Sequence, residues 1–171
     1  MADFVTALEK TLQHEGSDFV DDPHDKGGAT RFGITLNFYQ ETIDKKATSE
    51  DIKNLTPNTV GFLYHKYFWE PNRYQLIDSQ KIANKIFDLC VNIGPHANKM
   101  LQQAINMAAL ELTVKEDGII GSQTIAALNK LSEDKVYSEL IEEALQYYTN
   151  LVKNNPDQHV YLEGWLHRLE S

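Results

Sequence analysis

The chain has 171 residues, of which 42% are hydrophobic and 24% charged, a composition typical of one folded body and not of a disordered chain, a collagen or a coiled-coil rod. Its 16 Lys and Arg residues against 25 Asp and Glu residues leave a formal charge of −9, which repels nucleic-acid phosphates and anionic lipid headgroups. No stretch approaches the roughly 18 apolar residues of a membrane span, so we expect neither nucleic-acid binding nor stable membrane insertion.

The first predicted element is a helix that begins after Asp3, a good N-cap, and stops at Gly16. Its apolar stripe consists of Val5, Leu8, Leu12 and, at its end, Glu15. Turn-forming residues then dominate residues 17–34, with short β-prone pieces at 19–20 and 30–34. This composition predicts a looped hairpin that folds back against the helix.

Three helix-start signals follow the hairpin: Thr35, the capping box Thr48 with Asp51, and Thr56 before Pro57. The second half reads as helical throughout, with segments at 79–92, 95–110 and 122–131, where Ser122 is a predicted N-cap, and a long amphipathic helix through Val136, Leu140, Ala144 and Tyr148. We therefore predict a mostly-α (α+β) fold with a small β-hairpin. Residues 1–92 form one region, and residues 93–171 form a helical part packed into the same body.

Glu15 is the leading candidate for chemistry. A carboxylate on the apolar side of a helix end is partly desolvated, which favours its protonated form and suits a general acid. Asp25 and Thr30 follow on the hairpin, and a second carboxylate and a hydroxyl beside one acid are the groups that glycosidic cleavage needs. The alternatives are that Glu15 points into solvent and that Asp25 serves only the turn.

The histidines lack metal-ligand spacing, and the acidic loop misses the EF-hand pattern because Gly27 comes one place late and Phe32 stands at the twelfth position. We expect no metal and no other cofactor. The single cysteine, Cys90, lies in an apolar run and is expected to be a buried small hydrophobe.

Aromatic residues are concentrated between Phe62 and Tyr74, and sugar rings stack on aromatic surfaces. In a regular helix Phe62 and Trp69 share a face; most of the cluster is expected to be core, with Tyr67 and Trp69 as the candidate sugar contacts. Asp88 and Asn92 lie one helical turn apart, where they either bind an acetamido or hydroxyl group or form an interhelical contact and a C-cap. Arg168 is a candidate partner for a buried carboxylate.

Glu15-Gly16 together with residues 22–35 resembles the N-terminal signature of glycoside hydrolase family 108, the lysozyme-like N-acetylmuramidases of phage endolysins and secretion-associated muramidases. The likeness continues through residues 64–69, 87–94, 101–104, 117–124 and 164–168, the later ones similar to a peptidoglycan-binding part. One departure is Ser17-Asp18 before Phe19, where the family has a glycine and then an aromatic residue.

The resemblance implies a lysozyme-like fold that hydrolyses the β-1,4 bond between N-acetylmuramic acid and N-acetylglucosamine in peptidoglycan strands. Glu15 matches the catalytic glutamate, and Asp25 and Thr30 match the positions after it. A lytic transglycosylase, or a non-catalytic protein that binds peptidoglycan or assists secretion, remains an alternative.

The first residues, Met1 to Val5, lack the basic and apolar regions of a signal peptide. We expect synthesis in the cytoplasm and action on peptidoglycan in the periplasm or outside the cell. A holin or a secretion machinery would then be the partner that carries the protein across the membrane.

Overall fold

A computed structural model describes residues 1–21, 27–111 and 113–171, which form a mostly helical body with a small antiparallel sheet, as predicted. The longer helices are α1 (Phe4–Glu15), α4 (Pro57–Tyr64), α5 (Gln80–Ile93), α6 (His96–Ala109), α8 (Glu133–Asn154) and α9 (His159–Glu170). The shorter elements are β1 (Thr30–Arg31), β2 (Ile34–Thr35), α2 (Leu36–Thr42), α3 (Ser49–Lys53), the π-helix η1 (His65–Trp69), the 3₁₀ helices η2 (Tyr74–Leu76) and η3 (Pro156–Gln158), and α7 (Ser122–Leu128). None of the helices in these ranges has both the length and the apolar character needed to cross a bilayer.

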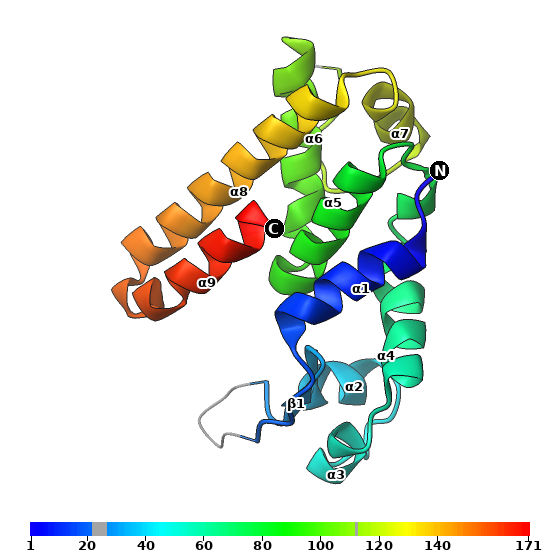
Figure 1. The fold of residues 1–171 in the computed structure, drawn as a ribbon, viewed down its shortest axis with the longest axis vertical. Coiled ribbons are helices and arrows are strands. Elements are labelled where there is room, and N and C mark those ends of the chain that lie inside the picture. The colour runs from blue at the N-terminus through cyan, green and yellow to red at the C-terminus, as the bar shows by residue number, and fades with distance from the viewer. Residues whose placement is uncertain (22–26, 112) are drawn as a thin grey trace.

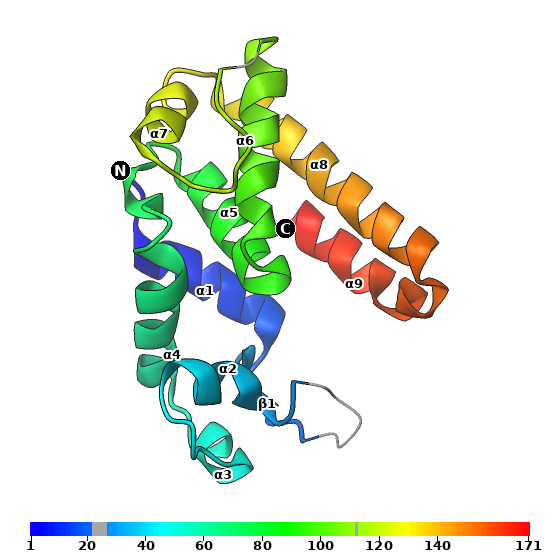
Figure 2. The same ribbon diagram turned by 180° about the vertical axis from the view of Figure 1, so that it is seen from behind.

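Helix α5 is the centre of the fold, with α1 and α6 beside it and the antiparallel pair α8 and α9 extending from the same body (Figures 1 and 2). Every residue from Ile82 to Cys90 is buried. A helix enclosed by neighbours in this way carries its polar residues into the interior as well. Lys85 and Asp88 are therefore buried, and both must find partners there.

Helix α1 begins and ends where the sequence predicts. The Asp3 carboxylate accepts a hydrogen bond from the Thr6 amide at 2.8 Å, and Gly16 ends the helix with φ +72°. The predicted stripe is wrong at Val5, which is 58% exposed. The inward face is made instead by Phe4, Ala7, Leu8, Thr11 and Leu12. Phe4, the neighbour of Val5, therefore takes the inward position that the sequence pattern assigned to Val5.

Strands β1 and β2 form the predicted hairpin, with Thr30 opposite Thr35 and Arg31 opposite Ile34. The Arg31 side chain donates to the Ser17 carbonyl at 3.2 Å, which ties the hairpin to the chain leaving α1. In Figures 1 and 2 the hairpin lies beyond the C-terminal end of α1, next to α2. The last residue of α1 therefore meets the hairpin.

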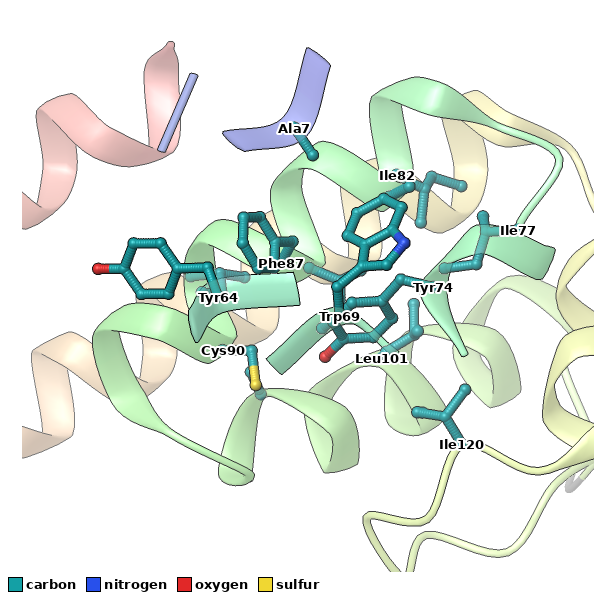
Figure 3. Close-up of a cluster of buried hydrophobic side chains, with 14 of the residues drawn as sticks. Ala7, Tyr64, Trp69, Tyr74, Ile77, Ile82, Phe87, Cys90, Leu101 and Ile120 are labelled. Carbon is teal, nitrogen blue, oxygen red and sulfur yellow. The ribbon is translucent and has the colours of Figure 1, made fainter. Parts of the chain in front are cut away.

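The predicted helix from Pro57 onward changes form after Tyr64, because residues 65–69 are a π-helix. A π-turn holds one more residue than an α-turn and shifts the side chains that follow it. Trp69 is consequently 1% exposed whereas Phe62 is 62% exposed, so the prediction that they share a face is wrong. Figure 3 shows the Trp69 ring among Phe87, Tyr74 and Ile82.

The second half is helical, as predicted. Val136, Leu140, Ala144 and Tyr148 are all buried along α8, which confirms its amphipathic pattern. One boundary differs: Gly121 is the N-cap of α7, and the predicted cap Ser122 is its first helical residue. Cys90 is buried, as expected.

Candidate active site

Glu15 is the last residue of α1, and its carboxyl group is held between α9 and the hairpin. Its side chain is 17% exposed, and Oε1 accepts a hydrogen bond from Nη2 of Arg168 at 2.5 Å. Arg168 comes from the last turns of α9, 153 residues further along the chain. The tertiary structure thus provides a partly enclosed carboxylate with a fixed cationic partner.

The second oxygen of Glu15 faces the hairpin turn. A Cβ atom added at Gly33 would lie 2.6 Å from Glu15 Oε2 and would also collide with the Tyr64 hydroxyl group. That hydroxyl donates to the Phe32 carbonyl at 2.8 Å. Burial, together with the negative charge of Glu15, raises the pKa of Tyr64. Tyr64 therefore stays protonated and holds the turn against the Glu15 carboxyl group.

Replacing Gly33 with Ala is expected to lower hydrolytic activity and stability. Gly33 has φ +73°, where an L-residue is strained by about 1–2 kcal/mol, and its new methyl group would displace the Glu15 carboxyl group. The matched control is Gly94→Ala, because Gly94 has the same φ of +73° and nothing within 4 Å of an added Cβ. Initial rates of cell-wall hydrolysis and thermal unfolding curves of both variants separate the effect of backbone strain from the displacement of Glu15. Equal activity in both variants would contradict the assigned contact.

Behind Glu15, Arg168 joins a buried charged cluster. Its Nε lies 3.3 Å from Oδ2 of Asp88, and Oδ1 of Asp88 contacts Nδ1 of His14 at 2.9 Å. Burial of Arg168 opposes its charge, but Asp88 and Glu15 outweigh that effect and raise the pKa of Arg168. The prediction that Arg168 partners a buried carboxylate is confirmed.

The cluster also corrects the prediction for Asp88. Its side chain is 4% exposed and is occupied by Arg168 and His14, so it has no surface to offer a sugar. The alternative prediction is the correct one: Asp88 of α5 makes an interhelical polar contact with Arg168 of α9. Asn92, one turn further along α5, is exposed, and its side-chain oxygen accepts a hydrogen bond from the Tyr148 hydroxyl at 2.8 Å.

A cleft of about 510 Å³ opens onto Glu15 and is lined by the end of α1, by Asn92 and by α9. This volume is in the range of small-ligand sites, roughly 300–1,000 Å³. Two aromatic side chains of α9 lie in it: Tyr161 is 56% exposed, and Trp165 stacks on Tyr148 with ring centroids 4.9 Å apart. The cleft thus combines a carboxyl group, an amide and aromatic surfaces, which are the groups that bind sugars.

The other predicted site residues lie elsewhere. The predicted sugar contact at Trp69 is wrong, because its ring is buried in the core. Tyr67 is half-buried, and its hydroxyl donates to the Thr42 carbonyl at 3.0 Å; it does not line the Glu15 cleft. Thr30 lies on β1 with its hydroxyl donating to the Gly28 carbonyl at 3.2 Å, and Asp25 falls outside the described residues.

The sequence reasoning missed four residues of the site: His14 and Tyr161, which line the cleft, and Tyr64 and Gly33, which lie beside the Glu15 carboxyl group. Tyr161 and Trp165 are spaced i, i+4 on one helix face, a signal that could have indicated a shared aromatic surface. No local pattern pairs Gly33 with Glu15, because the contact depends on how the hairpin folds back.

Comparisons with known proteins cover nearly the whole chain. Residues 8–94 match the family model described as glycosyl hydrolase 108, and residues 96–170 match one described as "Predicted Peptidoglycan domain". The solved structure of SagA from Brucella abortus is similar at TM-score 0.80 and 28% identity, over 98% of this chain and 89% of that chain. The comparison with curated proteins found no match. The chain thus has a lysozyme-like fold and acts on peptidoglycan as a glycoside hydrolase; it belongs to the glycosyl hydrolase 108 family.

Proposed function

We propose that the protein is an N-acetylmuramidase that hydrolyses the β-1,4 bond between N-acetylmuramic acid and N-acetylglucosamine, with Glu15 as the general acid. The observation that carries this proposal is the position of Glu15: a partly enclosed carboxyl group at the edge of a 510 Å³ cleft. Among the residues described, the other carboxylate of the cluster, Asp88, is buried and paired with Arg168, which leaves Glu15 as the group that can reach a bound glycan.

The proposed chemistry is proton transfer to the bridging oxygen. Glu15 gives its proton to the glycosidic oxygen as the bond to the muramic acid anomeric carbon breaks. Water adds to that carbon and loses a proton, so that the cycle ends with Glu15 protonated again. Asp25 and Thr30 remain our proposed groups for positioning the water or stabilising the positive charge on the sugar. Their support is the sequence motif of residues 22–35, which resembles the family's signature after the catalytic glutamate.

The cleft suggests how the glycan is held. We assign Asn92 to a hydrogen bond with an acetamido or hydroxyl group, since its amide nitrogen donates and its side chain is exposed. Tyr161 and Trp165 offer aromatic faces on which the C–H faces of sugar rings stack. Tyr67 stays a predicted contact for a part of the glycan beyond the cleft.

A lytic transglycosylase is the second candidate. In that mechanism one glutamate acts as acid and then as base, and the muramic acid product is an anhydro sugar. The observation that favours it is that Glu15 is the carboxylate lining the cleft among the described residues. Muramidase remains the first choice because the motif around Glu15 resembles that of hydrolytic N-acetylmuramidases.

Mass spectrometry of muropeptides distinguishes the two reactions. Purified sacculi digested with the protein are expected to yield fragments that end in reducing N-acetylmuramic acid. Reduction with borohydride labels these ends, and a digest without protein is the control. Anhydro-muramic ends would replace the muramidase assignment with the transglycosylase, and reducing N-acetylglucosamine ends would place the cleaved bond on the other side of the sugar.

We also propose a division of labour along the chain, with residues 1–92 as the lysozyme-like catalytic region and residues 93–171 as the peptidoglycan-binding part. The two family matches, which meet between residues 94 and 96, support this division. Because peptidoglycan lies outside the cytoplasmic membrane, a holin or a secretion machinery is the proposed route to it.

A further inference from the structure

Polar side chains from three helices form a continuous chain at the cleft: Glu15 and His14 of α1 and Arg168 of α9 line it, and the buried Asp88 of α5 contacts both Arg168 and His14. We propose that Arg168, held by Asp88, is a positioning residue for Glu15, so that the last helix completes the active site of the first region. This inference rests on the proposed function of Glu15 as general acid. It assigns to Arg168 and Asp88 roles that act through Glu15 and not through contact with the glycan.

Arg168 is built to orient a carboxyl group. Its guanidinium is rigid and planar, and its side chain is only 7% exposed. Nη2 donates to Glu15 Oε1 at 2.5 Å, while Nε lies 3.3 Å from Oδ2 of Asp88 as an ion pair. With Oε1 tied to α9 and Oε2 next to Gly33, the Glu15 carboxyl group has little freedom to rotate. A proton donor held in one orientation is worth more to catalysis than a mobile one.

The end of α9 is itself anchored, so that Arg168 cannot drift from Glu15. The Lys85 ammonium group, buried on α5, donates to the carbonyl oxygens of Arg168 at 2.6 Å and Leu169 at 3.3 Å. Burial lowers the pKa of Lys85, although the negative charge of Asp88 opposes the shift. Carbonyls at a helix end otherwise lack partners, and a cation there also suits the helix dipole.

Asp88 provides a counterion for Arg168 when Glu15 is protonated. When Glu15 carries its proton, Arg168 would be a buried cation without a counterion, which is unfavourable. Asp88 lies on the other side of the guanidinium and keeps a neutral pair in either protonation state of Glu15. Its Oδ2 has no hydrogen-bond partner among the described residues, so the contact of this oxygen with Arg168 is electrostatic. Asp88 therefore lets Glu15 be protonated while Arg168 stays in place.

Other titratable groups also face Glu15 and belong to the same electrostatic environment. They are His14 on α1, Tyr64 on α4, Tyr148 on α8, and His167 beside Arg168 on α9. The two tyrosines have pKa values raised by burial and remain neutral over the working range. The charges around Glu15 are thus Arg168 in contact with it, Asp88 paired with Arg168, and Lys85 at the end of α9. Removing the cation Arg168 and removing the anion Asp88 should have opposite effects.

The test is the pH profile of kcat on soluble peptidoglycan fragments. For a general acid, kcat falls on the alkaline side as the acid loses its proton. Arg168→Met removes the cation in contact with Glu15, so the alkaline limb should move to higher pH. Asp88→Asn removes the anion paired with Arg168, so the limb should move to lower pH. Arg168→Met should also lower kcat roughly 10- to 100-fold with little change in KM.

Arg168→Lys separates charge from geometry. Lysine keeps the positive charge but not the planar guanidinium group. The alkaline limb of the Arg168→Lys protein should therefore lie close to that of the wild type, while its kcat should lie between those of Arg168→Met and the wild type. Arg73→Met is the matched control, because Arg73 is exposed and does not line the cleft. Circular dichroism and thermal unfolding check each fold. If Arg168→Met does not fold, Asp88→Asn and Arg168→Lys carry the test.

The outcomes separate this inference from the proposed function. An inactive Glu15→Gln protein together with opposite shifts of the alkaline limb supports both. An inactive Glu15→Gln protein with wild-type pH profiles in Asp88→Asn and Arg168→Met overturns the positioning role alone. An active Glu15→Gln protein overturns the proposed function and the positioning role with it.

Discussion

Replacing Glu15 with Gln is expected to abolish hydrolysis of peptidoglycan while the protein still folds. Glutamine is nearly isosteric and keeps an oxygen that can accept from Arg168, but it cannot deliver a proton to the glycosidic oxygen. General acid catalysis typically contributes about 10²–10⁴-fold to a rate. We therefore expect a loss of that size, measured as release of soluble fragments from dye-labelled sacculi.

The matched control is Glu9→Gln, which makes the same chemical change on an exposed position of α1. Its rate should equal that of the wild type. Sedimentation with intact sacculi should show that the Glu15→Gln protein still binds them, since Asn92 and the aromatic side chains of α9 are unchanged. If this variant clears cell walls as fast as the wild type, Glu15 is not the acid, and a non-catalytic or differently placed site would have to be considered.

Replacing Trp69 with Ala is expected to lower the free energy of unfolding by about 3–5 kcal/mol, the usual cost of truncating a large buried aromatic side chain. Trp69 is 1% exposed and makes edge contacts with Phe4, Tyr74 and Phe87 at centroid distances of 5.5, 5.8 and 5.5 Å. The cavity left by the ring lies where η1 packs on α5, beside the Phe4 ring of α1; Figure 3 shows the ring next to Phe87 and Tyr74. Urea denaturation followed by circular dichroism measures the loss.

Phe62→Ala is the comparison variant, since Phe62 belongs to the same aromatic segment but is 62% exposed. Its effect on stability should be within about 0.5 kcal/mol, as for most surface substitutions. The pair tests the change of helical phase at η1. A Trp69→Ala protein of wild-type stability with a raised KM for glycan would contradict the core position and favour the original sugar-contact hypothesis.

Local signals in the sequence were reliable guides to where helices begin and end. Asp3, Thr35 and Thr56 act as N-caps, each accepting a hydrogen bond from the amide three residues later, and Thr48 with Asp51 forms the predicted capping box. These interactions span three or four residues, so neighbouring side chains decide them whatever the rest of the chain does. The same holds for the end of α1 at Gly16, where a positive φ is needed.

Helical periodicity failed where the helix was not regular. The π-turn in residues 65–69 lies inside a run that sequence spacing treats as α-helix, so Trp69 was assigned to the wrong face. The prediction that Asp88 and Asn92 of α5 act together was wrong for another reason. Asp88 and Asn92 share a face in sequence, yet the end of α9 covers Asp88 and leaves Asn92 exposed.

The family and most element boundaries of this protein therefore follow from short stretches of sequence, among them an acidic residue at a helix end, a glycine stop and a hairpin motif. The surroundings of Glu15 do not, because they come from contacts between residues far apart in the chain. Arg168 reaches Glu15 across 153 positions, and Gly33 approaches it only because the hairpin folds back. Charge and close packing act through space, so only the folded chain decides which cation and which glycine a carboxyl group meets.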